Sequence, residues 1–181
     1  PPALAHRLDK DTAGCLVLGR HRKALALLGK LFATGAVEKT YWAVTLGAPP
    51  DDEGVIEAPL ARRDATGRGW FMAVDPKGQP ATTGYRVLGR GGGLTWLELT
   101  PKTGRTHQLR VHCAHVGAPM LGDPIYGRAA ANGPRLHLLA RAVSLPLSCS
   151  RPPVRVVAPV PEHMAAVLAA CGARPEGEKD R

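Results

Sequence analysis

Hydrophobic and polar residues alternate most clearly between residues 39 and 46 of this 181-residue chain. Tyr41 and Ala43 fall on one face of an extended segment, while Trp42 and Val44 fall on the other. This period of two predicts a β-strand, which Gly47 would end. Gly, Pro and Asp residues separate further strand-like stretches, and the pattern predicts a short buried strand at 16–20 and others at 55–60, 70–74, 82–88 and 94–100. The Gly-rich run 91–93 is typical of a loop, and its spacing is not that of a phosphate-binding loop.

Helical spacing replaces this alternation in three places. Apolar residues recur at intervals of three and four between residues 21 and 34, and Gly35 is suited to end that helix. A second helix is predicted over 106–116, with Leu109, Val111 and Val116 as its apolar residues, and a third over 161–171. Strands outnumber helices and follow one another, so we expect an α+β fold with a mixed, mostly antiparallel sheet flanked by helices. One domain should cover residues 1–173, before a polar, disordered tail at 174–181.

Charge and composition indicate which kind of partner and which cellular environment to expect. A net charge of +9 and a pI near 9.9 favour a polyanionic partner, because phosphate contacts by Lys and Arg release counterions. Aromatic residues make up only 4% of the chain, so a nucleic acid would be held by charge, shape and a pocket. The four cysteines show no C-x-x-C spacing, so reduced thiols in a cytoplasmic protein are expected. No apolar run is long enough to span a membrane.

Three segments contain most of the residues with chemical potential. Residues 6–15 (HRLDKDTAGC) place the carboxylate of Asp9 between Arg7 and Lys10, before a turn-forming Thr-Ala-Gly. Residues 103–112 (TGRTHQLRVH) and 122–127 (GDPIYG) follow much later. Taken singly, an Asp in such a turn is more often a cap than a catalyst, and Arg110 on a polar helix is more often solvated.

Together and in this order, the segments resemble the RluA-type pseudouridine synthases. The strand Lys39-Thr40-Tyr41-Trp42-Ala43-Val44, the stretch 135–145 and residues 161–164 (PEHM) extend the resemblance over most of the chain. It implies the pseudouridine synthase fold and an isomerase that converts specific uridines to pseudouridine in structured RNA. No cofactor and no metal are implied.

The resemblance also implies roles for individual residues. Asp9 matches the catalytic nucleophile, and Tyr41 matches the tyrosine that packs against the target base and assists proton removal from C5. Arg110 matches the arginine that pairs with the catalytic carboxylate. Asp9 has to stay ionised whether it attacks C1′, helps to form a glycal or attacks C6, and these three routes stay open.

RNA contacts are expected from basic residues near Asp9. Arg7, two positions before it, is placed to fill the gap that a flipped base leaves or to grip the adjoining phosphate. Arg105, Lys10 and His107 are further RNA-binding candidates, and Lys102, Arg20 and Arg22 are weaker ones. A metal site at His107, His112 and His115 is disfavoured because no Cys or carboxylate completes a ligand set. Asp123 is expected to form a turn.

Two departures from the family pattern bear on the function. The Lys-Pro-x-Gly strand and the N-terminal S4-type domain of many members are absent here, so we expect a catalytic domain without its N-terminal part. Two smaller changes, Ala13 where serine is common and Leu139 where histidine is frequent, do not touch the proposed chemistry. The target RNA is expected to be large-subunit ribosomal RNA, with transfer RNA as the alternative, and the protein a cytoplasmic monomer.

Two other classes of function compete with the isomerase. One is an RNA-binding protein of the same fold whose activity has lapsed, although Asp9, Tyr41 and Arg110 are all present. The other is a retaining nucleosidase, which would need a second carboxylate as general acid, and no motif offers one.

Overall fold

The computed structural model describes residues 1–65, 69–127, 129 and 133–173. No helix in this part of the chain is both long enough and apolar enough to cross a membrane. The helices are α1 (Arg22–Ala33), α2 (Gln108–His115) and α3 (Glu162–Ala170). The strands are β1 (Ala3–Leu4), β2 (Ala13–Gly14), β3 (Leu18–Gly19), β4 (Glu38–Leu46), β5 (Glu53–Glu57), β6 (Leu60–Ala65), β7 (Gly69–Val74), β8 (Thr82–Gly91), β9 (Leu94–Pro101), β10 (Leu138–Leu145) and β11 (Val154–Val157).

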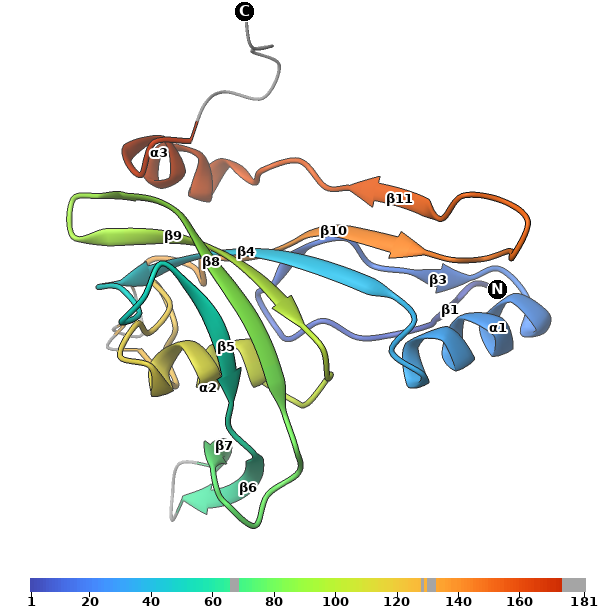
Figure 1. Cartoon of the computed structure of the whole chain (residues 1–181), viewed down its shortest axis with the longest axis horizontal. Coiled ribbons are helices and arrows are strands. Elements are labelled where there is room, and N and C mark those ends of the chain that lie inside the picture. Colours follow the sequence, from blue (N-terminus) through green and yellow to red (C-terminus); the bar gives the residue numbers. More distant parts are fainter. Residues whose placement is uncertain (66–68, 128, 130–132, 174–181) are drawn as a thin grey trace, which may run out of the picture.

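Seven strands form the central sheet (Figure 1). Six of them lie in the order β11-β10-β4-β9-β8-β5 and pair antiparallel, while β2 pairs parallel with β10. Strands β6 and β7 form a separate hairpin, and β1 pairs with β3. The predicted α+β class, with a mixed and mostly antiparallel sheet, is confirmed.

Both faces of the sheet are covered, which explains why β4 is apolar on both sides. Ala43 belongs to a core cluster that includes residues of α2, and its neighbour Val44 packs with Met164 and Leu168 of α3. Figure 1 shows α2 on one side of the sheet and α3 on the other. The helix predicted over 21–34 is α1, and Gly35 follows its end with the positive φ of 71° that glycine tolerates.

Several local predictions were wrong. The stretch 16–20 is not a buried strand, since Leu16 and Leu18 are exposed and only Leu18–Gly19 pairs, with β1. The strand expected at 55–60 ends at Glu57, and the strands β1, β2, β6 and β11 were not predicted. Strand β8 continues to Gly91 instead of stopping before the glycines. Residue 91 has to be glycine, because a Cβ there would meet the carbonyl oxygen of Ala170 at 1.8 Å. The tail 174–181 lies outside the described residues.

Helix α2 is buried on nearly all sides, which its sequence did not reveal. Leu109 and Val111 are buried as expected, but Gln108, Arg110 and His112 are buried as well. His112 lies 2.9 Å from the hydroxyl of Thr83 through Nδ1 and 3.0 Å from the carbonyl oxygen of Ala58 through Nε2. The carbonyl can only accept, so Nε2 carries the proton and Nδ1 accepts from Thr83.

A buried ion pair fastens α2 to the turn at 122–127. Arg110 donates from Nε and Nη2 to the two carboxylate oxygens of Asp123, at 2.8 and 2.7 Å. The backbone N–H groups of Ile125 and Tyr126 donate to the same carboxylate. Burial acts to raise the pKa of Asp123, but the hydrogen bonds from Arg110 and the backbone outweigh it and hold this pKa below its ordinary value. Asp123 therefore forms the expected turn and also neutralises a buried cation.

We expect Gly14→Ala to destabilise the fold by about 3 kcal/mol or more, through backbone strain and overpacking. Gly14 has a φ of 110°, and a Cβ would lie 2.3 Å from the carbonyl oxygen of Ala140 in β10. Gly35→Ala is the matched control, because φ is also positive there but nothing lies within 4 Å; it should cost only about 1–2 kcal/mol. Urea denaturation of both variants measures the difference, and equal losses would contradict the close approach of β2 to β10.

Asp123→Asn should lower the free energy of unfolding by about 3–5 kcal/mol, because it leaves the Arg110 guanidinium buried without a counter-charge. Glu98→Gln, which breaks the exposed pair with Arg86, should cost about 0–1 kcal/mol. Denaturant titration of the two variants compares the pairs directly.

The same comparison has a defined pH dependence. The pKa of Asp123 is lowered in the folded state, so its contribution is complete above the unfolded carboxyl pKa of about 3.9 and is lost as pH falls through the folded value. The stability advantage of the wild type over Asp123→Asn should shrink on acidification in that window. An advantage that grows there would contradict the buried pair.

Candidate active site

Asp9 opens a tight turn. The N–H of Thr12 donates to the carbonyl oxygen of Asp9 at 3.1 Å, and Asp11, the third residue of the turn, has a φ of 69°. Asp tolerates this left-handed conformation better than most residues with a side chain. The turn thus covers residues 9–12, whereas the Thr-Ala-Gly expected to form it leads into β2.

Strand β2 fixes this turn against the central sheet. Ala13 and Gly14 pair with Leu139 and Ala140 of β10, and the N–H of Cys15 donates to the carbonyl oxygen of Ala140 at 2.9 Å. Because Gly14 leaves no room for a side chain, the segment lies directly on the β10 backbone. The position of Asp9 is therefore set by a strand near the far end of the chain.

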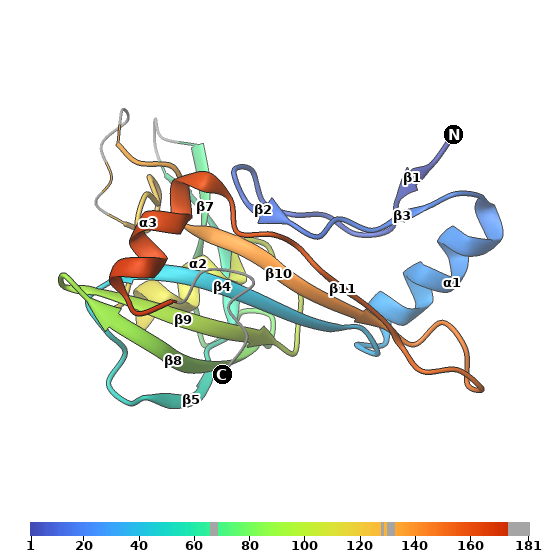
Figure 2. The same cartoon turned by 90° about the horizontal axis from the view of Figure 1, so that it is seen from above.

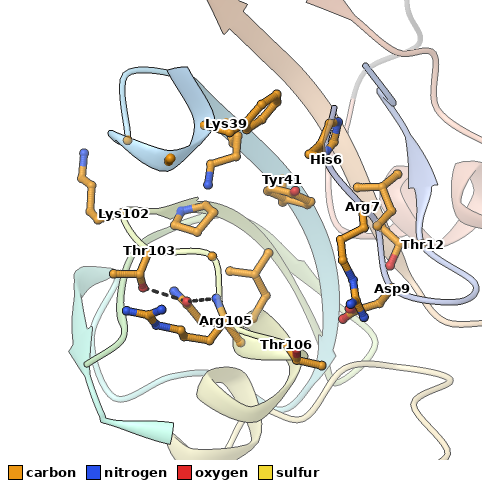
Figure 3. Close-up of a pocket in the computed structure, with 18 of the residues that line it drawn as sticks. His6, Arg7, Asp9, Thr12, Lys39, Tyr41, Lys102, Thr103, Arg105 and Thr106 are labelled. Carbon is orange, nitrogen blue, oxygen red and sulfur yellow. Dashed lines mark hydrogen bonds between the residues drawn. The ribbon is translucent and has the colours of Figure 1, made fainter. Parts of the chain in front are cut away.

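A cleft of about 620 Å³ lies beside this turn (Figure 3). Three segments form most of its wall: residues 5–9 with Thr12, residues 32–35 with Lys39 and Tyr41, and residues 101–106 with Gln108 and Leu109. Leu138 of β10 completes the lining. Asp9 and Tyr41, which the sequence analysis singled out together, thus share one cavity.

The charges in this cleft are strongly unequal. Asp9 is the only carboxylate among its lining residues, and they include the four basic side chains Arg7, Lys39, Lys102 and Arg105. The hydroxyl of Thr12 is buried in the same wall and has no hydrogen-bond partner within the described protein. The cleft can thus attract an anion and still present one negative group, Asp9, to it.

Tyr41 belongs both to the core and to the cleft. Its ring packs against the core cluster between α2 and the sheet, and it also lines the cavity. Burial, with smaller effects of Asp9 and Cys15, raises the pKa of its phenol to about 12. Tyr41 is therefore a neutral phenol at physiological pH, with a rigid aromatic ring at the cavity wall.

Lys39 was quoted in the sequence analysis but not recognised as a site residue. It lies two positions before Tyr41 in β4, so the alternation of the strand brings both side chains to the same face. Burial lowers the pKa of Lys39. Nearby, the ring of His6 stacks on Phe32 at 4.6 Å, and its Nε2 accepts from the N–H of Val17. Strand periodicity alone was the signal that could have identified Lys39.

The wall formed by residues 103–105 is held by Gln108. Its Oε1 accepts from the hydroxyl of Thr103 at 2.7 Å and from the N–H of Arg105 at 3.0 Å (Figure 3). Its Nε2 donates to the carbonyl oxygen of Thr82 and to the hydroxyl of Thr83 in β8. Arg105 in turn donates from Nε to the carbonyl oxygen of Pro80. The basic loop is consequently preorganised on the sheet.

Arg110 lies behind the cleft and does not line it. The partner of its ion pair, within the described residues, is Asp123; the direct pair with Asp9 that the resemblance implied is not present. Burial acts to lower the pKa of Arg110, but Asp123 and, more weakly, Asp9 keep it above its ordinary value. The fold thus brings Asp9 and Arg110 close enough to interact electrostatically, although they are far apart in the sequence.

His107 links this buried pair to the β6–β7 hairpin. The N–H of Met72 donates to the hydroxyl of Tyr126, which lies 2.8 Å from Nδ1 of His107. The hydroxyl of Tyr126 thus joins β7 to the residue that precedes α2. Burial, opposed by Asp9, lowers the pKa of His107. His107 also has a φ of 53°, a strained conformation at the start of α2.

The predicted site residues thus separate into three groups. Arg7, Asp9, Tyr41 and Arg105 line the cleft. Arg110 and His107 lie behind it, and Lys10 is exposed in the turn beside Asp9. No group of three or more His, Cys, Asp or Glu in the described part of the chain is placed to hold a metal ion.

Comparison with known proteins agrees with this geometry. The family model for RNA pseudouridylate synthases matches residues 1–115. An uncharacterized RNA pseudouridine synthase from Zymomonas mobilis is 39% identical over 163 residues, which cover 89% of this chain and 74% of that protein. The ribosomal large subunit pseudouridine synthase D of Nitrosomonas europaea is 37% identical over 187 residues, which cover 98% of this chain but 54% of that protein.

A solved structure shows the same fold. Human RNA Pseudouridylate Synthase Domain Containing 4 superposes with a TM-score of 0.79 at 29% identity, covering 95% of this chain and 76% of the human chain. The family model covers the three segments that form most of the cleft wall. The chain belongs to the RNA pseudouridylate synthase family.

Proposed function

We propose that this chain isomerises uridine to pseudouridine in structured RNA, with Asp9 as the nucleophile. The observation that carries the proposal is a single carboxylate, Asp9, in a cleft that it shares with Tyr41 and four basic side chains. A retaining glycosidase or nucleosidase would need two carboxylates about 5–5.5 Å apart. The lining of the cleft offers no second one, so this geometry favours the isomerase.

The reaction needs no external reagent, because uridine and pseudouridine are isomers. The N1–C1′ bond breaks, the uracil turns, and C5 bonds to C1′; C5 loses a proton and N1 gains one. A carboxylate can attack C1′, take the C2′ proton or attack C6, and each route requires the ionised form of Asp9. The basic side chains around it are placed to hold the RNA phosphates.

Tyr41 and the residues behind the cleft have supporting roles in this proposal. The ring of Tyr41 provides a surface on which a flipped uracil can stack. Arg110 is paired with Asp123, so its charge interacts with Asp9 only weakly and without a hydrogen bond. Arg7 and Arg105 are the proposed phosphate contacts, and Lys10 and His107 are weaker candidates.

The target we propose is ribosomal RNA of the large subunit. Several similar proteins are named ribosomal large subunit pseudouridine synthase D, and others, from rice and Arabidopsis, are named mitochondrial RNA pseudouridine synthases. This chain spans about half the length of several curated relatives, so the activity and target of the whole protein are part of this proposal. A cytoplasmic location and a monomeric state stay predictions from the sequence.

The assay is release of tritium from RNA labelled at C5 of uracil. Asp9→Asn should lower the rate of this release by at least about 10³-fold. Asp11→Asn is the matched control: it removes a carboxylate from the same turn, and Asn tolerates the positive φ at that position. The control should stay close to the wild type. Activity in the Asp9→Asn protein would overturn the nucleophile, and free uracil as product would indicate a nucleosidase.

Tyr41→Phe and Tyr41→Ala separate the two roles of Tyr41. Tyr41→Phe keeps the stacking ring and removes the hydroxyl, so kcat should fall on the order of 10²-fold with KM unchanged. Tyr41→Ala should also raise KM, because it removes the surface for the base. Steady-state kinetics on one RNA substrate make this comparison, and a fully active Tyr41→Phe protein would exclude the hydroxyl from proton transfer.

A further inference from the structure

A second cavity adjoins the cleft and has no role in the function proposed above. Its volume is about 770 Å³, and residues of the β6–β7 hairpin, the turn at 77–80 and the loop at 105–106 line it. Arg7, Arg105 and Thr106 line both cavities, so they form the boundary between them. A strand of RNA that leaves the cleft in this direction meets the second cavity next.

The charge of the second cavity fits a polyanion. Its lining includes Arg7, Arg62, Lys77 and Arg105 and no carboxylate. Arg105 uses Nε to donate to Pro80, and this is its only side-chain hydrogen bond within the described residues. The ion pair of Arg62 with Asp64 is long, at 3.4 Å, and both side chains are mostly exposed, so it contributes little. These cations are available to phosphates.

Trp70 supplies an aromatic surface in the same cavity. It is 42% exposed, whereas Trp42 and Trp96 pack on each other in the core on the other side of the sheet. The guanidinium of Arg62 lies over the indole of Trp70 at 5.1 Å. An exposed aromatic ring among cations is the usual arrangement for stacking a nucleobase. Because Arg62 is exposed and weakly held, it can move from the ring to a phosphate when a base arrives.

The indole of Trp70, which would serve as the stacking platform, is held in place by contacts that extend toward the first cleft. The indole of Trp70 stacks on His107 at 5.4 Å, and the N–H of Met72 in the same strand donates to Tyr126. Tyr126 contacts both His107 and the guanidinium of Arg110. The hairpin is therefore fixed relative to Asp9, and a preformed platform loses less entropy when a ligand binds.

We propose that the second cavity binds a nucleotide that flanks the target uridine in the same RNA strand, with its base on Trp70 and its phosphate among Arg7, Arg62, Lys77 and Arg105. The inference rests on the proposed function and extends it to substrate choice. Substrates should need at least one unpaired nucleotide beside the target, because a base held in a duplex cannot reach the indole.

Binding of RNA tests the cavity separately from catalysis. The probe is a fluorescein-labelled single-stranded RNA of mixed sequence, about 12 nucleotides long, within the range that a single-strand site covers. Trp70→Ala should weaken its binding about 5- to 100-fold, and Trp70→Phe should retain most of the affinity. Arg62→Ala combined with Lys77→Ala should reduce the slope of log K against log salt by about 1.4, as expected for two lost phosphate contacts.

The charge-matched control is Arg151→Ala combined with Arg155→Ala. Both arginines are exposed, and Arg155 lies in β11, at the edge of the sheet far from the hairpin (Figure 2). This pair should leave the salt slope unchanged. Equal slopes for the two double variants, or wild-type affinity of Trp70→Ala, would overturn the proposed subsite.

Tritium release by the wild-type protein is measured in the same series. If the wild type is active but the hairpin variants bind and react normally, the subsite alone fails. If the wild type releases no tritium, the proposed function fails. The binding data then still decide whether the second cavity binds RNA. Unfolding of each variant at the temperature of the wild type would show that its overall fold is intact.

Discussion

Arg110 and Asp123 bury opposite charges together behind the Asp9 turn, and the elements around the cleft are held through them. Removing a guanidinium and a carboxylate from water costs several kcal/mol for each ion unless they are closely paired and fully hydrogen-bonded. Here two side-chain hydrogen bonds and two backbone N–H groups meet that requirement. Helix α2 and the turn at 122–127 are consequently fixed to each other, and Tyr126 extends the same contacts to β7.

The net positive charge of the cleft does not depend on Arg110, because Arg110 pairs with Asp123 and not with Asp9. Because Asp123 neutralises Arg110, the net positive charge beside Asp9 comes from side chains that line the cavity and are open to an RNA phosphate. A polyanion and an ionised carboxylate can then share a small space without strong repulsion. Tyr41 adds a ring that stays neutral, since burial keeps its phenol protonated.

Local sequence patterns predicted what local forces determine. Alternation identified β4 and β9, and helical spacing identified α1 and α3. Asp9 and Tyr41 were named from the family resemblance, and the fold places both in one cleft. The burial of Arg110 was not predictable, because its partner lies outside α2 and a charged residue at a core position breaks the periodic pattern. Strand β6 was not predicted, because the polar residues Arg62, Arg63 and Asp64 are typical of a loop. The cavity beside Trp70 was missed for the same reason. The glycines at the end of β8 were interpreted as a loop, because the need for glycine there comes from a long-range contact with the end of α3.

The pairing of β2 with β10 joins Ala13 to Leu139, 126 positions apart. The turn that carries Asp9 thus leaves the ribosome well before the strand that fixes it in place. At about 5–20 residues per second, roughly 6–25 s of synthesis separate the two strands. Closing so long a loop is also slow during refolding, since distant pairings lose chain entropy before their contacts form. The cleft is therefore assembled as a late event of folding, and an incomplete chain carries the carboxylate without the wall that would place a uridine against it.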